Sequence, residues 1–226
     1  MYYFDPTYLL VIAGFLLALA AQAWVKSAYS KYGKVMTRQG QPAAQVAQQI
    51  LHENGNDAVS IAPISGQLTD HYDPRSETLS LSEGVFNSPS VAALGIAAHE
   101  AGHAMQKMEG YGPLAVRSAL VPVVNISSTL GIPVVIAGLV FSIRPLVTFG
   151  IILFALAVVF ALVALPVEFN ASKRAIRMLT AGGHITAQEE QGVRRVLNAA
   201  AMTYVAAAVG AALTLLRLVL ISRRRK

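Results

Sequence analysis

Four apolar stretches, each long enough to cross a lipid bilayer, constrain this 226-residue chain more than any other feature of its sequence. A bilayer-spanning helix needs about 20 predominantly apolar residues. The stretches are residues 8–25, 118–141, 146–166 and 199–221. Composition agrees, because 54% of the residues are hydrophobic and 13% are charged, whereas a soluble domain has about 45–50% and about 25%. We therefore expect a mainly α membrane protein with about four transmembrane helices.

The first stretch is predicted to be a retained anchor rather than a cleaved signal peptide. Its start carries no basic residue, and no clear small-residue cleavage site follows it. Aromatic side chains favour the membrane–water interface, and they stand at both ends of this stretch: Tyr2, Tyr3, Phe4, Tyr8 and Trp24.

The apolar stretches divide the chain into five parts. These are an N-terminal anchor (1–25), a large non-membrane part (26–117), a transmembrane hairpin (118–166), a polar segment (167–198), and a C-terminal transmembrane helix with a basic tail (199–226). The two non-membrane parts are separated by two spans, so they lie on the same side. Most of the lysine and arginine residues near the spans flank these parts, which predicts the cytoplasmic side; the tail Arg223–Lys226 argues against it. The net charge of +6 then serves lipid head groups and topology rather than nucleic acid.

The non-membrane part 26–117 shows an α+β pattern. A helix is expected after Pro42, ending before Gly55, and strands over residues 59–64 and 78–82, with residues 70–74 as a loop between them. A second helix is expected over residues 89–108, with Asn87 as its N-cap and Pro89 in its first turn.

Residues 99–103 read His-Glu-Ala-Gly-His, an H-E-x-x-H motif within this second helix. His99 and His103 are four residues apart, so on a helix both imidazoles point to one side and can bind one Zn²⁺. Glu100 lies beside them, placed to act as general base on a zinc-bound water, whose pKa the zinc lowers. The alternative is a solvated or interfacial helix that carries two histidines. The zinc interpretation is favoured because small residues around the histidines leave space for a metal ion. These residues are Ala97, Ala98, Ala101, Gly102 and Ala104.

A catalytic zinc takes three protein ligands and leaves a position for water. Because the chain has no cysteine, the third ligand must be His, Asp or Glu. Glu168 is the strongest candidate, since a carboxylate directly after an apolar span is unfavourable without a partner. Its alternative is an interfacial ion pair with Lys173 or Arg174. The remaining candidates have simpler interpretations: Glu109 as a charged helix end, Glu189 and Glu190 as surface partners of Arg194 and Arg195, and His184 and His52 as caps or surface residues.

His71 and the strand expected at residues 79–82 each have a functional and a purely structural interpretation. His71, between Asp70 and Asp73, is a candidate for transition-state stabilisation or substrate orientation, or a loop histidine fixed in a turn. The strand expected at residues 79–82 is either ordinary sheet or an edge strand to which an extended peptide substrate adds.

Two stretches of this sequence resemble the YugP-type neutral zinc metallopeptidases, a family of multi-spanning membrane proteins, and the resemblance covers nearly the whole chain. They are GQLTDHYDPRSETLSLSEGVFNSPSVAALGIAAHEAGHAMQ and LPVEFNASKRA. The resemblance implies zinc-dependent peptidase activity in a membrane. More distantly, residues 168–172 are similar to the E-x-x-A-D segment of the HtpX/Ste24 membrane gluzincins, which implies His99, His103 and Glu168 as ligands and Glu100 as base. Ser172 stands where those enzymes have Asp, so the carboxylate that usually supports a ligand is absent or replaced, for example by Asn170.

We therefore expect a membrane-integral zinc metallopeptidase, with a small zincin-like α+β portion that carries the H-E-x-x-H helix and one Zn²⁺ per chain. Its expected substrate is a membrane-associated peptide or protein, cut on the cytoplasmic side of a bacterial-type plasma membrane. The alternatives are a non-catalytic membrane protein with a structural metal site closed by His71 or His184, and a zinc hydrolase of a non-peptide substrate. Two histidines and one carboxylate also suit Fe(II) or Mn(II), and the H-E-x-x-H spacing favours zinc. No feature specifies an oligomeric state.

Overall fold

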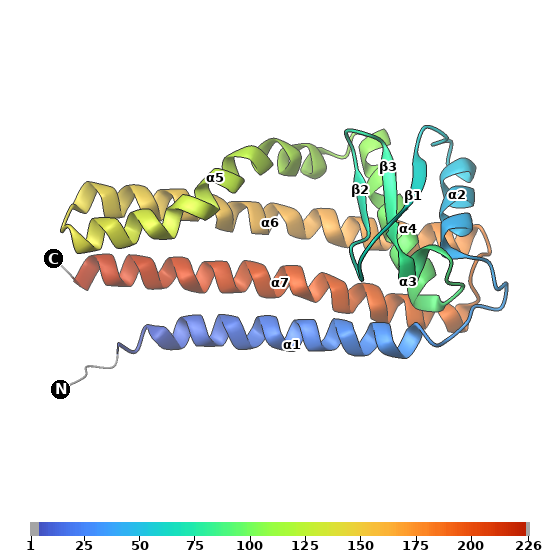
Figure 1. Ribbon diagram of the computed structural model, residues 1–226, viewed down its shortest axis with the longest axis horizontal. Helices are drawn as coiled ribbons and strands as arrows, with labels where there is room; N and C mark the ends of the chain where they lie inside the picture. The colour runs from blue at the N-terminus through green and yellow to red at the C-terminus, as the bar shows by residue number, and fades with distance from the viewer. Residues whose placement is uncertain (1–4, 225–226) are drawn as a thin grey trace. The chain divides into compact units, whose positions relative to one another are not determined.

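The computed structural model describes residues 5–224, which are mainly α-helical with one small β-sheet (Figure 1). They form two compact units, each assembled from segments far apart in the sequence. The first, which we call the helical unit, comprises residues 5–22, 115–166 and 202–224 of the described chain. The second, the mixed unit, comprises residues 23–114 and 167–201. The aromatic residues Tyr2, Tyr3 and Phe4 and the last two basic residues of the tail lie outside the described residues.

The helical unit is built from parts of four long helices. They are α1 (Tyr8–Tyr32), α5 (Gly112–Val140), α6 (Arg144–Ala181) and α7 (Ala187–Arg224). All four are long and apolar enough to cross a membrane, by length and composition. Large apolar side chains such as Phe15, Ile126 and Ile152 are more than half exposed. Such a surface is unfavourable in water and suits a lipid environment.

Glycines allow the helices of this unit to approach closely. A Cβ built on Gly138 of α5 would lie 2.6 Å from the backbone nitrogen of Val147 in α6. A Cβ on Gly14 of α1 would lie 3.0 Å from the Cα of Gly210 in α7. Without a hydrophobic driving force between helices in lipid, close backbone packing of this kind is a main source of their association.

Helix α6 continues well beyond Pro166, where the apolar stretch ends. Proline lacks a backbone N–H and often ends a helix, but here the following turns are held by packing. Val167, Ala171, Ala175 and Leu179 recur at every fourth position and are all fully buried. This face belongs to the mixed unit, so the residues predicted as a polar segment are largely helical.

The mixed unit packs three further helices against a three-stranded sheet around one apolar core. The helices are α2 (Ala43–Glu53), α3 (Glu83–Phe86) and α4 (Val91–Met108), and the strands are β1 (Ser60–Ile64), β2 (His71–Asp73) and β3 (Thr78–Ser82). The core contains side chains from α2, β3, α4 and α6, among them the fully buried Ile50, Leu51, Leu79, Leu81, Leu94 and Leu179.

The sheet has the strand order β1-β3-β2, with β1 parallel and β2 antiparallel to β3. The prediction of a loop over residues 70–74 is wrong, because His71, Tyr72 and Asp73 pair with residues 78–80 of β3. Of the two interpretations of residues 79–82, ordinary sheet is confirmed and an edge strand is excluded. Both of its sides are already paired, so a peptide can add only to β1 or β2.

Helix α4 begins two residues later than its sequence predicts. Ser90 is its N-cap, and the Ser90 hydroxyl accepts a hydrogen bond of 3.2 Å from the backbone N–H of Ala93. Asn87 instead ends the short helix α3. Pro89 is outside the helix because its carbonyl accepts a hydrogen bond from Thr37, in an extended segment that pairs with residues 89–91.

Candidate metal centre

Helix α4 presents the two histidines of the H-E-x-x-H motif on one side, as their spacing requires. The imidazoles of His99 and His103 lie edge to face, with ring centroids 4.8 Å apart. Both side chains are mostly buried, with exposed fractions of 14% and 12%. In both rings Nε2 is the nitrogen that lies near Glu168 of α6.

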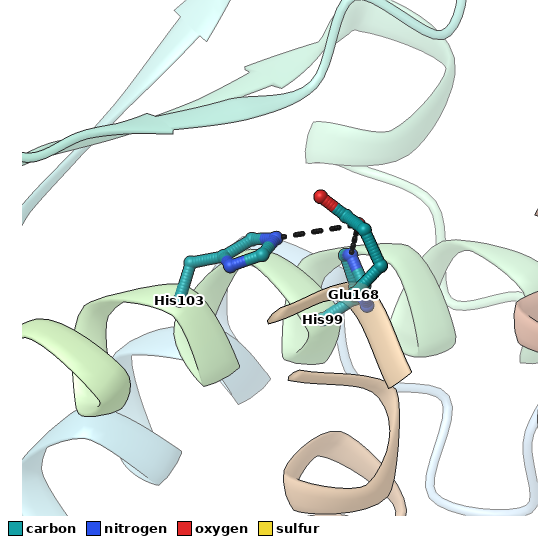
Figure 2. Close-up of side chains that lie close together, drawn as sticks. All are labelled: His99, His103 and Glu168. Carbon is teal, nitrogen blue, oxygen red and sulfur yellow. Dashed lines mark hydrogen bonds and ion pairs between the residues drawn. The ribbon is translucent and has the colours of Figure 1, made fainter. Parts of the chain in front are cut away.

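Glu168 reaches the two histidines from α6, two residues after Pro166. Its carboxylate oxygen Oε2 lies 3.2 Å from Nε2 of His99 and 3.6 Å from Nε2 of His103. The side chain is almost fully buried, and all three residues belong to the mixed unit. Figure 2 shows the imidazoles and the carboxylate pointing toward one another across the gap between α4 and α6. The third ligand candidate is therefore adjacent to the H-E-x-x-H motif in space.

A glycine on α4 makes this approach of the two helices possible. A Cβ on Gly102 would lie 2.7 Å from the carbonyl oxygen of Ala171 in α6, a distance that real Cβ atoms do not adopt. Gly102 precedes His103 by one residue, and Ala171 is three residues after Glu168. The absence of a side chain at position 102 thus sets the distance between the histidines and the carboxylate.

The three side chains fit a zinc ion. Two ligands at about 2.0–2.1 Å from one tetrahedral zinc are about 3.3–3.4 Å apart, and the two nitrogen–oxygen distances of 3.2 and 3.6 Å bracket that value. One ligand atom from each residue lies within 4.8 Å of both others. Two imidazoles and one carboxylate form a donor set typical of catalytic zinc, which keeps its fourth position for water.

Each histidine is also held at its second nitrogen, Nδ1, by a neutral side chain. His103 Nδ1 lies 2.9 Å from Oε1 of Gln106, and His99 Nδ1 lies 3.2 Å from the hydroxyl of Ser172. Contacts of this kind orient a ligating imidazole. Ser172 thus stands beside His99, where the sequence suggested Asn170 as the replacement for a carboxylate. Asn170 instead contacts Gln106, at 3.0 Å. Sequence analysis missed Gln106, whose only signal was a polar residue on the motif helix.

Glu100 is the remaining residue of the motif, and its side chain is 9% exposed. Among the described residues, its carboxylate has no hydrogen-bond or ion-pair partner. Its negative charge acts on the neighbouring His103. A buried carboxylate without a partner beside a metal site is available to accept a proton.

The pKa of His103 is raised above its ordinary value. Burial lowers it, but the hydrogen bond to Glu168, the charges of Glu100 and Glu168 and the hydrogen bond to Gln106 together outweigh burial. The metal-free site therefore holds a proton on His103 to a higher pH than an isolated histidine does. A metal ion must displace that proton to bind.

The other candidates from the sequence lie outside this cluster. His71 is exposed on β2, and its Nδ1 lies 2.8 Å from the carbonyl oxygen of Thr69. His184 is buried 3.4 Å from Glu53, so of its two interpretations, cap or surface residue, the second is wrong. Its backbone N–H donates to the carbonyl of Leu179 at the end of α6. Three candidates make surface contacts: His52 with Asp57, Glu109 with Arg174, and Glu190 with Arg194. The prediction that Glu189 also pairs with a nearby arginine side chain is wrong, because its carboxylate accepts from the backbone N–H groups of Arg38 and Thr186.

Comparison with known proteins gives two matches. Residues 7–223 match a protein family described as "Putative neutral zinc metallopeptidase". The chain is 45% identical over 212 residues to the "Putative membrane protease YugP" of Bacillus subtilis (strain 168), covering 94% of each chain. No solved structure matches.

Proposed function

Because this chain belongs to the neutral zinc metallopeptidase family, we propose that it is a membrane-integral zinc endopeptidase whose metal is held by His99, His103 and Glu168. The observation that carries the proposal is the convergence of these three side chains from α4 and α6 at distances that suit one zinc ion. The name of the relative, a membrane protease, supports the same class of activity.

A bound zinc ion supplies a Lewis acid that makes water more acidic and polarises a substrate carbonyl. The chain supplies the proton transfers. A carboxylate oxygen of Glu100 accepts a proton from the attacking water and then delivers it to the leaving amine of the cleaved peptide bond. The burial of Glu100 and its lack of a hydrogen-bond partner among the described residues support this role.

His71 remains a proposed hydrogen-bond donor to the oxyanion. Its hydrogen bond to Thr69 limits the protonation state in which it can act. The Thr69 carbonyl can only accept, so Nδ1 of His71 is the donor in that contact. The neutral ring then has no proton on Nε2. His71 can therefore stabilise a negatively charged oxygen through Nε2 only as the imidazolium.

The proposed setting is a membrane, with the mixed unit on the cytoplasmic side. Four helices are long and apolar enough to span, and their exposed side chains are largely apolar. The basic residues that flank the mixed unit favour the cytoplasm. The proposed substrate is a membrane-associated peptide or protein cut near the interface.

A closed structural metal site is not favoured by the described residues. A structural zinc normally has four protein ligands, whereas the cluster found in the described part of the chain has three. The two histidines suggested as a fourth ligand are bonded elsewhere, His71 to Thr69 and His184 to Glu53. The open position favours catalysis.

The test uses the full chain purified in detergent, with zinc per chain measured by elemental analysis and cleavage followed on a peptide library. We expect one zinc per chain and cleavage by the wild type. Glu100→Gln should retain zinc and lose cleavage, and the matched control Glu190→Gln, at an exposed ion pair, should retain both. Wild-type cleavage by Glu100→Gln would contradict the mechanism. If the chain hydrolyses amide or lipid substrates but no peptide, the peptidase hypothesis is wrong and the alternative of a zinc hydrolase with a non-peptide substrate takes its place.

A further inference from the structure

Gln106 is a fully buried amide on α4, three residues after His103 and in contact with its ring. We propose that Gln106, held in one orientation by Val167 and Asn170 of α6, is a positioning residue that fixes His103 in the tautomer with a free Nε2 for the metal. This inference rests on the metal site of the proposed function and adds a residue that acts through a ligand.

The orientation of the Gln106 amide follows from its two partners on α6. Its Nε2 lies 2.8 Å from the carbonyl oxygen of Val167 and 3.0 Å from Oδ1 of Asn170. A backbone carbonyl can only accept a hydrogen bond, so the atom facing Val167 must be the NH₂ group of Gln106. The reversed amide would place the oxygen of this fully buried side chain against two oxygens. Oε1 must therefore face His103.

The orientation of Asn170 is determined from the opposite end. Its Oδ1 also accepts a hydrogen bond of 2.7 Å from Nε of Arg174, a side chain that can only donate. Arg174 is itself paired with Glu109 at 2.6 Å and lies over the ring of Tyr111. The hydrogen bonds of Gln106 and Asn170 therefore have fixed directions. The carbonyl of Val167 can only accept, and the guanidinium of Arg174 can only donate.

The consequence for His103 is a single neutral tautomer. Oε1 of Gln106 accepts, so Nδ1 of His103, 2.9 Å away, must carry the proton. A neutral imidazole has one N–H, so Nε2 keeps its lone pair. Nε2 is the atom that faces Glu168, as Figure 2 shows. A free lone pair at this atom is what a metal ion requires.

His99 lacks an equivalent constraint. Its Nδ1 contacts the hydroxyl of Ser172 at 3.2 Å, and a hydroxyl can rotate to donate or to accept. The contact is compatible with either tautomer. The two ligand histidines are therefore held unequally, and the loss of Gln106 should disturb the site more than the loss of Ser172.

The test compares full-length variants in detergent by two measurements that do not depend on peptide cleavage. Zinc affinity is measured by chelator competition, and the His103 tautomer by nitrogen–proton correlation spectra of protein labelled at histidine. Gln106→Met keeps the side-chain volume but removes the acceptor and both donors. Asn170→Asp keeps an oxygen that accepts from both Gln106 and Arg174, so it is the conservative control. Asn170→Ala removes one acceptor without altering Gln106, and replaces Gln106→Met if that variant does not fold.

In the zinc-loaded chain we expect Nδ1–H and no Nε2–H on His103, both in the wild type and in Asn170→Asp, with similar zinc affinity. Gln106→Met should bind zinc about 10–100-fold more weakly, the range for loss of a residue that orients a ligand, and should lose the single tautomer. Asn170→Ala should show a smaller loss of the same kind. Unchanged affinity and tautomer in Gln106→Met, or in Asn170→Ala where that variant replaces it, would overturn the inference. So would Nε2–H on His103 in the zinc-loaded wild type. A wild type that binds zinc without cleaving peptides would contradict the proposed function and leave this inference standing, whereas one that binds no zinc would overturn both.

Discussion

Helix α6 is continuous through Pro166, but its two parts differ in which side chains they expose and which they bury. Before Pro166 the helix exposes large apolar side chains, among them Phe149, Ile152 and Leu162. After Pro166 it buries one face at every fourth residue, and that part also contains the buried Glu168. Burial of a carboxylate requires a partner, whereas an extended exposed apolar surface is unfavourable in water. The same helix thus exposes an apolar surface in one part and carries a candidate metal ligand in the other.

Close helix contacts also differ between the two parts. Before Pro166, a Cβ on Gly150 would lie 2.7 Å from the backbone nitrogen of Val135, so this glycine permits tight packing in the α5–α6 hairpin. After Pro166, the close contact is between Ala171 and Gly102 of α4. The first contact joins two apolar helices, and the second sets the geometry of three candidate ligands.

The largest effect is expected from Glu168→Ala, which removes the one candidate ligand on α6. Zinc affinity should fall by more than about 100-fold, because even loss of a residue that supports a ligand costs about 10–100-fold. Chelator competition and elemental analysis of the purified chain measure this effect. The control Glu190→Ala should bind zinc as the wild type does. Stoichiometric, tight zinc in Glu168→Ala would exclude Glu168 as a ligand.

The next largest effect tests the lipid-facing character of the part before Pro166. Ile152→Lys places a charge in the middle of the apolar stretch, where insertion costs about 2.5–3.5 kcal/mol. Phe169→Lys is the matched change after Pro166, at a residue that is also exposed. We expect Ile152→Lys to reduce the membrane-inserted fraction in a glycosylation-mapping assay and Phe169→Lys to leave it near the wild-type value. Equal insertion of both variants would show that α6 does not span the membrane.

A smaller effect is expected when the contact between α4 and α6 is overfilled. Gly102→Ala forces a methyl group against the Ala171 carbonyl, a backbone atom that cannot rotate away. Overpacking of this kind costs about 1–3 kcal/mol, and the displaced helices should bind zinc more weakly. The control is Gly95→Ala on the same helix, whose Cβ would come closest to a side-chain methyl of Val193, at 3.3 Å, and no nearer than 3.8 Å to that residue's backbone. Chemical unfolding in detergent measures both, and equal stability of the two variants would contradict the close-contact argument.

The features predictable from sequence are those whose pattern is local. The apolar stretches and the H-E-x-x-H spacing lie within single helices, and Glu168 could be selected because it directly follows a span. Gln106 could not be selected in this way, since its partners Val167 and Asn170 are 61 and 64 residues away. The continuation of α6 was missed because it depends on burial against the core of the mixed unit rather than on hydropathy. The sequence could not decide whether residues 79–82 form an edge strand, because β2 is too short to show a strand pattern.

The pH dependence of zinc binding provides a further test of the buried carboxylates. The pKa of His103 is raised in the metal-free chain. Burial lowers it, but the hydrogen bonds to Glu168 and Gln106 and the charges of Glu100 and Glu168 together outweigh burial. Zinc affinity should be full above the raised pKa and should fall by about tenfold per pH unit below it, as protons compete for the ring. In Glu100→Gln one of the two charges is absent, so the fall should begin at a lower pH. An identical pH profile in Glu100→Gln would show that Glu100 does not act on His103.

The smallest effect is expected from Ser172→Ala, which removes the contact to Nδ1 of His99 in the part of α6 after Pro166. A neutral hydroxyl at 3.2 Å makes a weak hydrogen bond and does not select a tautomer. We expect zinc affinity to fall by less than about 10-fold, the lower end of the range for residues that orient a ligand. Ser172→Asp should act in the opposite direction, since a carboxylate accepts from Nδ1–H and increases the basicity of the ligating ring. Chelator competition at one pH compares both variants with Gln106→Met. A loss in Ser172→Ala as large as that in Gln106→Met would show that the two histidines are held equally.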